Sequence, residues 1–324
     1  MPQLRIDTFL VLILGSAALA ALLPATGAEA DGVDVVTTVA IFGLFFGYGA
    51  RLSLAEAWAG LRHWRLHVLI LGITFVLFPL VAVAVRALPD GVLGPVLTLG
   101  FGYLCLVPST VQSSITFTSL AGGNVAGAMV SATASNLLGV VLTPLLAVAL
   151  LPSSAGNAIT LDSFVAVLLQ LLLPFVLGQL SRRWTAGFIA RRRRQVKYLD
   201  QFVICLVVYG AFSDFFASRS WRSIEPGHLL LMTLMCLMLL AFMLWFTWWL
   251  GGRLRFSRED RIAIMFCGTK KSLATGVPMA SVLFAGQAVG LIVLPLMIFH
   301  QAQLMACTVI AQHLSGRSDP IQQP

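Results

Sequence analysis

The stretch MFCGTKKSLATGVPM, Met265–Met279, places two adjacent lysines, Lys270 and Lys271, inside an apolar run that extends over Ile262–Phe284. A run of this length can cross a bilayer as one helix, since about 20 residues are needed. Glycine, proline and hydroxyl side chains beside the lysines loosen the backbone, remove a donor or compete for backbone partners. We therefore predict a membrane-spanning helix that is interrupted at the two lysines.

A similar interruption is predicted in the first half of the chain. The stretch PSTVQSS, Pro108–Ser114, combines a proline with three serines and a threonine inside the apolar run Val92–Ser119. The same physical reasons apply to its backbone. Two discontinuous helices are therefore expected.

The composition is that of a membrane protein. Of the 324 residues, 58% are hydrophobic and 10% are charged, whereas a soluble domain carries about 25% charged residues. Ten segments are apolar and long enough to span a bilayer: Thr8–Ala25, Val35–Leu52, Leu66–Val85, Val92–Ser119, Val125–Leu151, Phe164–Leu180, Leu199–Phe216, His228–Leu250, Ile262–Phe284 and Val289–Leu314. The chain is predicted to be an all-α, multi-pass membrane protein with one polytopic domain over residues 1–324, and the lipid bilayer is its first partner.

Basic residues set the predicted topology. They gather in the loops after the second, sixth and eighth spans, at Arg51, Arg62, Arg65, Arg182, Arg183, Arg191, Arg192, Arg193, Arg194, Lys197, Arg253, Arg255, Arg258 and Arg261. Loops rich in Lys and Arg stay in the cytoplasm. Both termini are therefore expected in the cytoplasm, in a protein of the cell (inner) membrane. The same pattern accounts for the net charge of +8 without nucleic-acid binding.

The first thirty residues allow two interpretations. Arg5, the following apolar run and the sequence Ala28-Glu29-Ala30 match a secretory signal with its cleavage site. The length of the run and the even number of spans favour a retained first helix.

The chain divides into two repeats of five spans, at about residues 1–154 and 155–324. An odd number of spans inverts the second repeat relative to the first. Ala121–Gly127 (AGGNVAG) and Ala285–Gly290 (AGQAVG) are weakly similar. The interrupted spans are the fourth and the ninth, which correspond in the two repeats, and such pairs mark the binding site of secondary transporters.

Both interruptions are expected at the same depth. Ser113 lies nine positions before Gly122, and Lys270 lies nine positions after Arg261, so both are roughly 13 Å from one membrane surface. A lysine at mid-membrane costs roughly 2.5–3.5 kcal/mol. At least one lysine should therefore face a wet cavity, towards an anion or the end of a half-helix. The alternative is a structural cation that links the two interruptions through carbonyl groups.

The candidate substrate- or ion-binding residues share polar side chains near the interruptions. They are Thr110, Gln112, Ser113, Ser114, Asn136, Thr269, Lys270, Lys271, Ser272 and His300. Half-helix N-termini suit an anion, hydroxyl and carbonyl oxygens suit sodium, and a buried lysine can carry a proton. Asn136 and His300 (with Gln301) are equally expected as interhelical hydrogen-bond partners.

Two stretches resemble the bile acid:sodium symporter superfamily, and most closely its bile-acid-symporter-like (SBF-like) branch. They are PSTVQSSITFTSLAGGNVAGA (Pro108–Ala128) and MFCGTKKSLATGVPM (Met265–Met279). The resemblance implies ten transmembrane helices as two inverted five-helix repeats, with crossed, discontinuous helices 4 and 9 in a core domain beside a panel domain. It also implies transport of organic anions, often coupled to sodium.

The resemblance carries over a sodium site only in part. Ser113 and Ser114 match a Ser-Asn pair that binds sodium, and Thr133 lies next to a position that carries a hydroxyl in the family. These three residues are the candidate sodium ligands. Thr74 stands where a sodium-binding glutamine is found.

The ninth span departs from the family pattern. Phe266 replaces the acidic sodium ligand, Lys270 a glutamine and Lys271 the following asparagine. We hypothesise that lysine charge replaces one or both sodium ions.

The predicted function is secondary active transport of a small organic anion by alternating access. Sodium or a proton is the candidate coupling ion, and no other cofactor is expected. The alternatives are a cation/proton exchanger and a non-transporting regulatory membrane protein of the same fold. An enzyme is not expected, because the sequence has no HExxH motif, paired intramembrane carboxylates or histidine cluster. The sequence leaves the substrate and the oligomeric state open.

Overall fold

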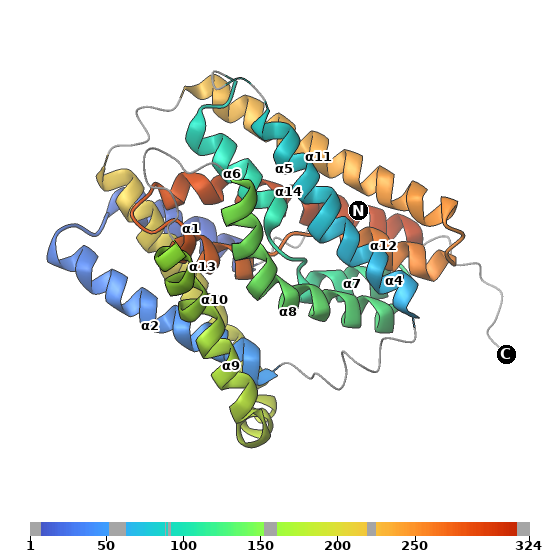
Figure 1. The fold of residues 1–324 in the computed structure, drawn as a ribbon, viewed down its shortest axis with the longest axis horizontal. Coiled ribbons are helices and arrows are strands. Elements are labelled where there is room, and N and C mark those ends of the chain that lie inside the picture. Colours follow the sequence, from blue (N-terminus) through green and yellow to red (C-terminus); the bar gives the residue numbers. More distant parts are fainter. Residues whose placement is uncertain are drawn as a thin grey trace. The chain divides into compact units, whose positions relative to one another are not determined.

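A computed structural model describes residues 8–51, 63–87, 89, 92–151, 161–218 and 225–315. All regular secondary structure in these residues is helical (Figure 1). The helices are α1 (Thr8–Leu22), α2 (Ala28–Arg51), α4 (Trp64–Gly72), the π-helix η2 (Ile73–Leu77), α5 (Phe78–Arg86), α6 (Pro95–Leu106), α7 (Val111–Leu120), α8 (Val125–Leu150), α9 (Leu161–Arg191), α10 (Arg193–Ala217), α11 (Pro226–Arg253), α12 (Arg258–Thr269), α13 (Leu273–Leu283) and α14 (Val289–Ser315). Arg5, part of the possible secretory signal, and Arg62, part of the predicted topology, lie outside the described residues.

Long apolar helices make this an integral membrane protein. Among the described residues, six helical segments are long and apolar enough to cross a bilayer: α2, the segment from α4 through η2 to α5, α8, α10, α11 and α14. The pair α6–α7 passes the same test as one span with a bend of 60°. The other predicted spans are helical as well, as α1, α9 and the pair α12–α13. The prediction of an all-helical membrane protein is confirmed.

One predicted loop is wrong. The sixth span was expected to end at Leu180 and the seventh to begin at Leu199, but α9 continues to Arg191 and α10 begins at Arg193. Arginine and lysine are good helix formers, and this segment contains no proline and a single glycine, Gly187. The arginines therefore lie on helix ends rather than in an irregular loop.

The chain folds into two compact units, and the first is held by close helix contacts. Unit 1 comprises Met1–Leu52, Ser153–Leu229 and Gly276–Leu294. Within it, α2 and α9 touch backbone to backbone: a Cβ atom added to Gly49 would lie 2.0 Å from the carbonyl oxygen of Phe175, and one added to Gly178 would lie 2.0 Å from that of Phe46. Small residues allow helices to approach closely where lipid supplies no hydrophobic driving force.

Unit 2 contains both interruptions. It comprises Ser53–Pro152, Leu230–Thr275 and Pro295–Pro324. Each unit therefore takes helices from both halves of the chain. The break between α6 and α7 and the break between α12 and α13 coincide with the two predicted interruptions, and both can be followed in Figure 1.

The glycine contact gives a first prediction. Gly49→Ala places a methyl group against the α9 backbone, so the two helices must separate. We expect a loss of about 1–3 kcal/mol of stability, measured as a lower midpoint of thermal unfolding in detergent. Gly43→Ala in the same helix is the control, because a Cβ there meets no atom within 4 Å. Equal midpoints for both variants would contradict the close contact.

Candidate functional site

The first interruption separates α6, which ends at Leu106, from α7, which begins at Val111. Val107 and Thr110 have extended backbones, with φ −70° and ψ 150° and with φ −81° and ψ 126°. Pro108 stands between them, and proline neither donates a backbone hydrogen bond nor favours a helical residue before it. The chain therefore leaves the helix with carbonyl groups that no helical N–H can reach.

Five consecutive carbonyls at this interruption all have partners, at 2.7–2.9 Å. Cys105 and Val107 accept from Lys271 Nζ, Leu106 from Thr143 Oγ1, Pro108 from the N–H of Ser272, and Ser109 from Asn136 Nδ2. The N–H of Ser109 donates to Ser135 Oγ at 3.0 Å. A buried polar group without a partner costs about 1–3 kcal/mol, so these hydrogen bonds offset the free-energy cost of breaking the helix. Helix α8 supplies three of the side chains.

The second interruption lies between Thr269, the last residue of α12, and Leu273, the first of α13. Lys270 has an extended backbone, with φ −77° and ψ 146°. The hydroxyl of Ser272 accepts the N–H of Thr275 at 3.2 Å, which is the contact of an N-terminal helix cap. Helix α13 therefore begins independently of α12.

Helix α14 holds the backbone of Lys271. The N–H of Lys271 donates to Gln303 Oε1 at 3.0 Å, and its carbonyl accepts from Gln303 Nε2 at 3.1 Å. His300 Nδ1 lies 3.0 Å from the same carbonyl. One amide side chain thus satisfies both backbone groups of one residue in the break.

The two interruptions contact each other directly. Hydroxyl groups of the first donate to carbonyls of the second: Thr110 Oγ1 to Lys271 (3.0 Å), Ser109 Oγ to Cys267 (2.7 Å) and Ser114 Oγ to Phe266 (3.3 Å). The two breaks therefore form one hydrogen-bonded centre in unit 2.

The ammonium group of Lys271 binds the end of helix α6. It donates to the carbonyls of Cys105 and Val107 at 2.9 Å each and to that of Thr74 at 3.4 Å, and it lies 3.9 Å from the ring centre of Phe78. Lys271 is fully buried. A helix C-terminus carries partial negative charge, so a cation bound to three carbonyls is favourable there.

The carbonyl of Thr74 is available because of the π-helix. In a regular α-helix the carbonyl of Thr74 would accept from the N–H of Phe78, but this N–H donates to the carbonyl of Ile73 instead. The next N–H would belong to Pro79, which has none. The π-turn and the proline together free this carbonyl for Lys271.

Lys270 differs from its neighbour. It is also fully buried, but its Nζ has no hydrogen-bond partner among the described residues. The ammonium lies 4.2 Å from the ring centre of Phe117 and beside the thiols of Cys307 and Cys267, and Cys307 is close enough for a weak N–H···S interaction rather than a full hydrogen bond. Ser113, one helical turn before Phe117 and on the same face, also has a buried hydroxyl without a partner. A buried ammonium without an oxygen partner keeps N–H donors that an acceptor can bind.

The structure places the candidate residues in three situations. Thr110, Ser114, Asn136, Lys271, Ser272 and His300 hydrogen-bond within the centre. The Ser113 hydroxyl and the Lys270 ammonium are buried there and have no oxygen partner in the described part of the chain. Gln112 is exposed, Thr269 bonds to Met265 of its own helix, and Thr133 is half-buried on α8 without a hydrogen bond to the other candidates in the described part of the chain.

Several residues of the centre were missed by sequence reasoning. Gln303, rather than Gln301, bonds to the second interruption. It follows His300 by three positions and therefore shares its helix face, which was a usable signal. Ser135 and Thr143 gave no comparable signal, because isolated hydroxyls in an apolar helix commonly bond to their own backbone.

A sodium ion does not fit the residues present. Phe266 stands where the resemblance places a carboxylate, so the charged ligand of the family's site is missing. The ammonium of Lys271 already occupies three carbonyl oxygens. The centre thus holds two lysines, and repulsion between like charges opposes a further cation.

Comparisons with known proteins agree with this architecture. The SBF-like CPA transporter family matches residues 7–316. "Uncharacterized protein PA2026" of Pseudomonas aeruginosa is 48% identical over 98% of this chain and 96% of its own length. "Putative symporter YfeH" of Escherichia coli is 44% identical over 98% and 95%. "Sodium/bile acid cotransporter 7" of Danio rerio is 30% identical over 97% and 96%. The chain therefore belongs to the SBF-like CPA transporter family, a family of membrane transporters rather than of enzymes.

Proposed function

We propose that this protein is a secondary active transporter of a small organic anion and that the joined interruptions are its binding centre. The observation that carries the proposal is the contrast between two buried lysines: the ammonium of Lys271 is bound by three carbonyls, whereas that of Lys270 has no oxygen acceptor among the described residues. A protein that only needed a cation to close the break would be complete with Lys271. The second charge calls for a ligand of opposite sign.

The hydrogen bonds of the centre support an inverted repeat of five plus five helices. Ser109 precedes the first residue of α7 by two positions, and Lys271 precedes the first residue of α13 by two positions. Both residues have their N–H and their carbonyl bound by side chains of the following long helix, α8 for Ser109 and α14 for Lys271. Equivalent positions with equivalent partners are expected of duplicated halves.

Helix pairing in unit 1 is consistent with the same symmetry. Helix α1 contacts α10, and α2 contacts α9. If α1 corresponds to α9 and α2 to α10, exchanging the two halves of the chain converts the α1–α10 contact into the α9–α2 contact. The proposal therefore includes ten spans, both termini in the cytoplasm and a location in the inner membrane.

The two lysines have different roles in this proposal. Lys271 replaces a coupling cation, because its ammonium binds backbone carbonyls that would otherwise be available to sodium. Lys270, with the hydroxyl of Ser113 on the neighbouring face, binds the acidic group of the substrate. Alternating access then moves this centre between the two sides of the membrane, driven by coupling to protons.

Transport by the purified protein in liposomes tests the function. We expect uptake of at least one member of a panel of carboxylates and sulfonates, including cholate, with the same rate in external sodium as in external potassium. The reason is that lysine charge already fills the cation positions. Uptake that needs two or more sodium ions per anion would contradict this mechanism. Absence of anion flux together with proton-coupled cation flux would favour an exchanger instead.

The lysines are tested by Lys271→Met and Lys270→Met, which remove charge at similar volume. Lys271→Met leaves three buried carbonyls without a donor, so we expect a loss of about 1–3 kcal/mol of stability or more. Lys270→Met removes no hydrogen bond to an oxygen atom of the described residues, so its thermal midpoint should equal or exceed that of the wild type while anion uptake is lost. Thermal unfolding in detergent and uptake into liposomes measure the two effects. If Lys270→Met transports normally, the proposed anion site is wrong.

A further inference from the structure

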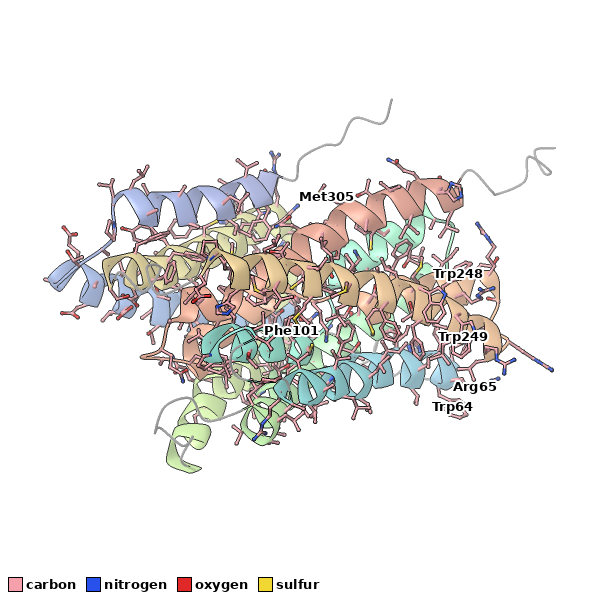
Figure 2. The ribbon with its side chains drawn as sticks, turned by 90° about the horizontal axis from the view of Figure 1, so that it is seen from above. Trp64, Arg65, Phe101, Trp248, Trp249 and Met305 are labelled. Carbon is pink, nitrogen blue, oxygen red and sulfur yellow. The ribbon has the colours of Figure 1, made fainter. Side chains whose placement is uncertain are left out.

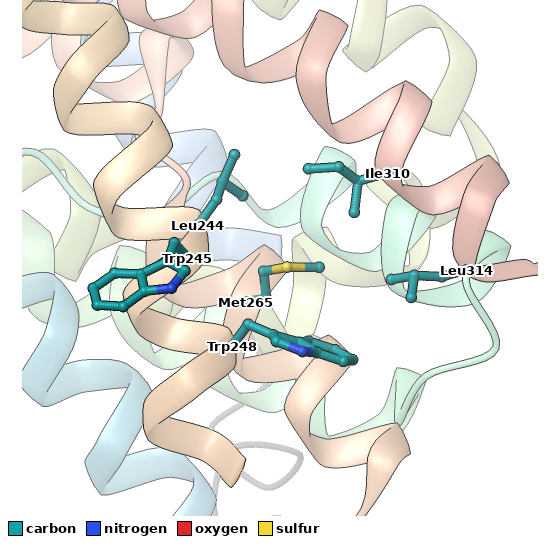
Figure 3. Close-up of a pocket in the computed structure, with 6 residues that line it drawn as sticks. All are labelled: Leu244, Trp245, Trp248, Met265, Ile310 and Leu314. Carbon is teal, nitrogen blue, oxygen red and sulfur yellow. The ribbon is translucent and has the colours of Figure 1, made fainter. Parts of the chain in front are cut away.

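An apolar cavity lies between α11, α12 and α14 in unit 2. Its volume is about 300 Å³, the lower end of the range of pockets that bind small molecules. Its lining is Leu244, Trp245, Trp248, Met265, Ile310 and Leu314 (Figure 3). Trp245 is 61% exposed, whereas Leu244, Met265 and Leu314 are buried. The cavity therefore has an open side and an apolar floor.

One face of α12 joins this cavity to two arginines. Arg258, Arg261 and Met265 follow each other at spacings of three and four residues, so they lie on one helix face. Arg258 Nη2 donates to the carbonyl of Leu314 at 2.8 Å, and Arg261 Nη2 donates to that of Trp248 at 3.1 Å. Both acceptors belong to residues that line the cavity. The guanidinium groups therefore stand at its rim.

The arginines keep donors for a further ligand. Each guanidinium has five N–H groups. Arg261 lies 4.1 Å from the ring centre of Trp248, and its buried Nε has no partner among the described residues. The acidic neighbour Asp260 accepts from Asn124 at 2.7 Å instead, and Glu259 is exposed. Positive charge thus dominates the rim of an apolar cavity.

The cavity lies at one end of the helices of unit 2. Trp64, Trp248 and Trp249 lie at this end (Figure 2), and Arg65 contacts the ring of Phe256 there at 5.5 Å. Tryptophan and arginine gather where a membrane helix passes from hydrocarbon to lipid headgroups. A ligand at this place meets lipid on its apolar side and headgroups on its charged side.

We propose that this cavity binds an anionic phospholipid, with one acyl chain against Met265 and Ile310 and the phosphate on Arg258 and Arg261. The order of groups along α12 matches that of the lipid: two cationic residues, then an apolar floor one turn deeper. A small hydrophilic anion would leave the floor unfilled, and a zwitterionic lipid would bring its own cation next to the two arginines. Met265 belongs to α12, the half-helix that ends beside Lys270, and its carbonyl accepts a hydrogen bond from Thr269 at that end. The acyl chain would therefore contact this half-helix.

Native mass spectrometry of the purified, delipidated full-length protein tests this site. Phosphatidylglycerol and phosphatidylcholine with identical acyl chains are the probes. We expect phosphatidylglycerol to bind at least about tenfold more tightly, since one basic residue near anionic lipid contributes about fivefold. Arg258→Gln with Arg261→Gln should abolish this preference. Ile310→Trp, which fills the cavity, should weaken both lipids.

Controls make the outcomes decisive. Arg253→Gln with Arg255→Gln removes two exposed arginines at the same end and should leave the preference unchanged. Equal binding of both lipids by the wild type would overturn the proposal. So would a loss of the preference for phosphatidylglycerol in this control that equals the loss in the Arg258 and Arg261 variant. So would full competition by glycerol phosphate, which indicates a phosphate site alone, or unchanged lipid binding with an altered dimer fraction in Ile310→Trp, which indicates a second copy of the chain. Helical circular dichroism verifies that each variant is folded.

Discussion

The structure of unit 2 depends on one constraint: a helix that is broken away from water must find a partner for each backbone group that it releases. The carbonyls from Cys105 to Ser109 meet this constraint with donors from two other segments, the second interruption and α8. Lys271 supplies two of these bonds with a single ammonium group. Since an unpaired group in hydrocarbon costs several kcal/mol, neither interruption would be stable alone.

This constraint also limits what the centre can recognise. Most of its hydroxyl and amide groups, including those of Thr110, Asn136 and Gln303, are occupied by backbone groups. Among the described residues of the centre, few polar atoms remain for a ligand, and Lys270 carries the charged one. In the proposed transporter, affinity would come from this one charge, whereas selectivity would come from the shape of the apolar surroundings. Broad acceptance of anions of similar size is the natural result.

Sequence reasoning identified the interruptions because their chemistry is local. Pro108 ends α6 through its missing N–H, and the pair Lys270–Lys271 is conspicuous in an apolar run. It did not assign different roles to the two lysines, because adjacent residues in an extended segment point in opposite directions and only tertiary structure decides which one meets carbonyls. The π-turn at Thr74 was equally hidden, since nothing in its composition separates it from an α-helix. The helical continuation to Arg191 was missed because charge was taken as a sign of a loop.

The contact between Gly49 and Gly178 has a mechanical meaning. Each glycine lies against a carbonyl of the opposite helix. A shift of α2 along α9 by one turn would place a larger side chain against that carbonyl, so the steric contact opposes sliding. Any rearrangement of this unit must carry both helices together as one lever. At the end of the pair, Arg51 forms an ion pair with Asp200 of α10, which attaches a third helix to the same rigid element.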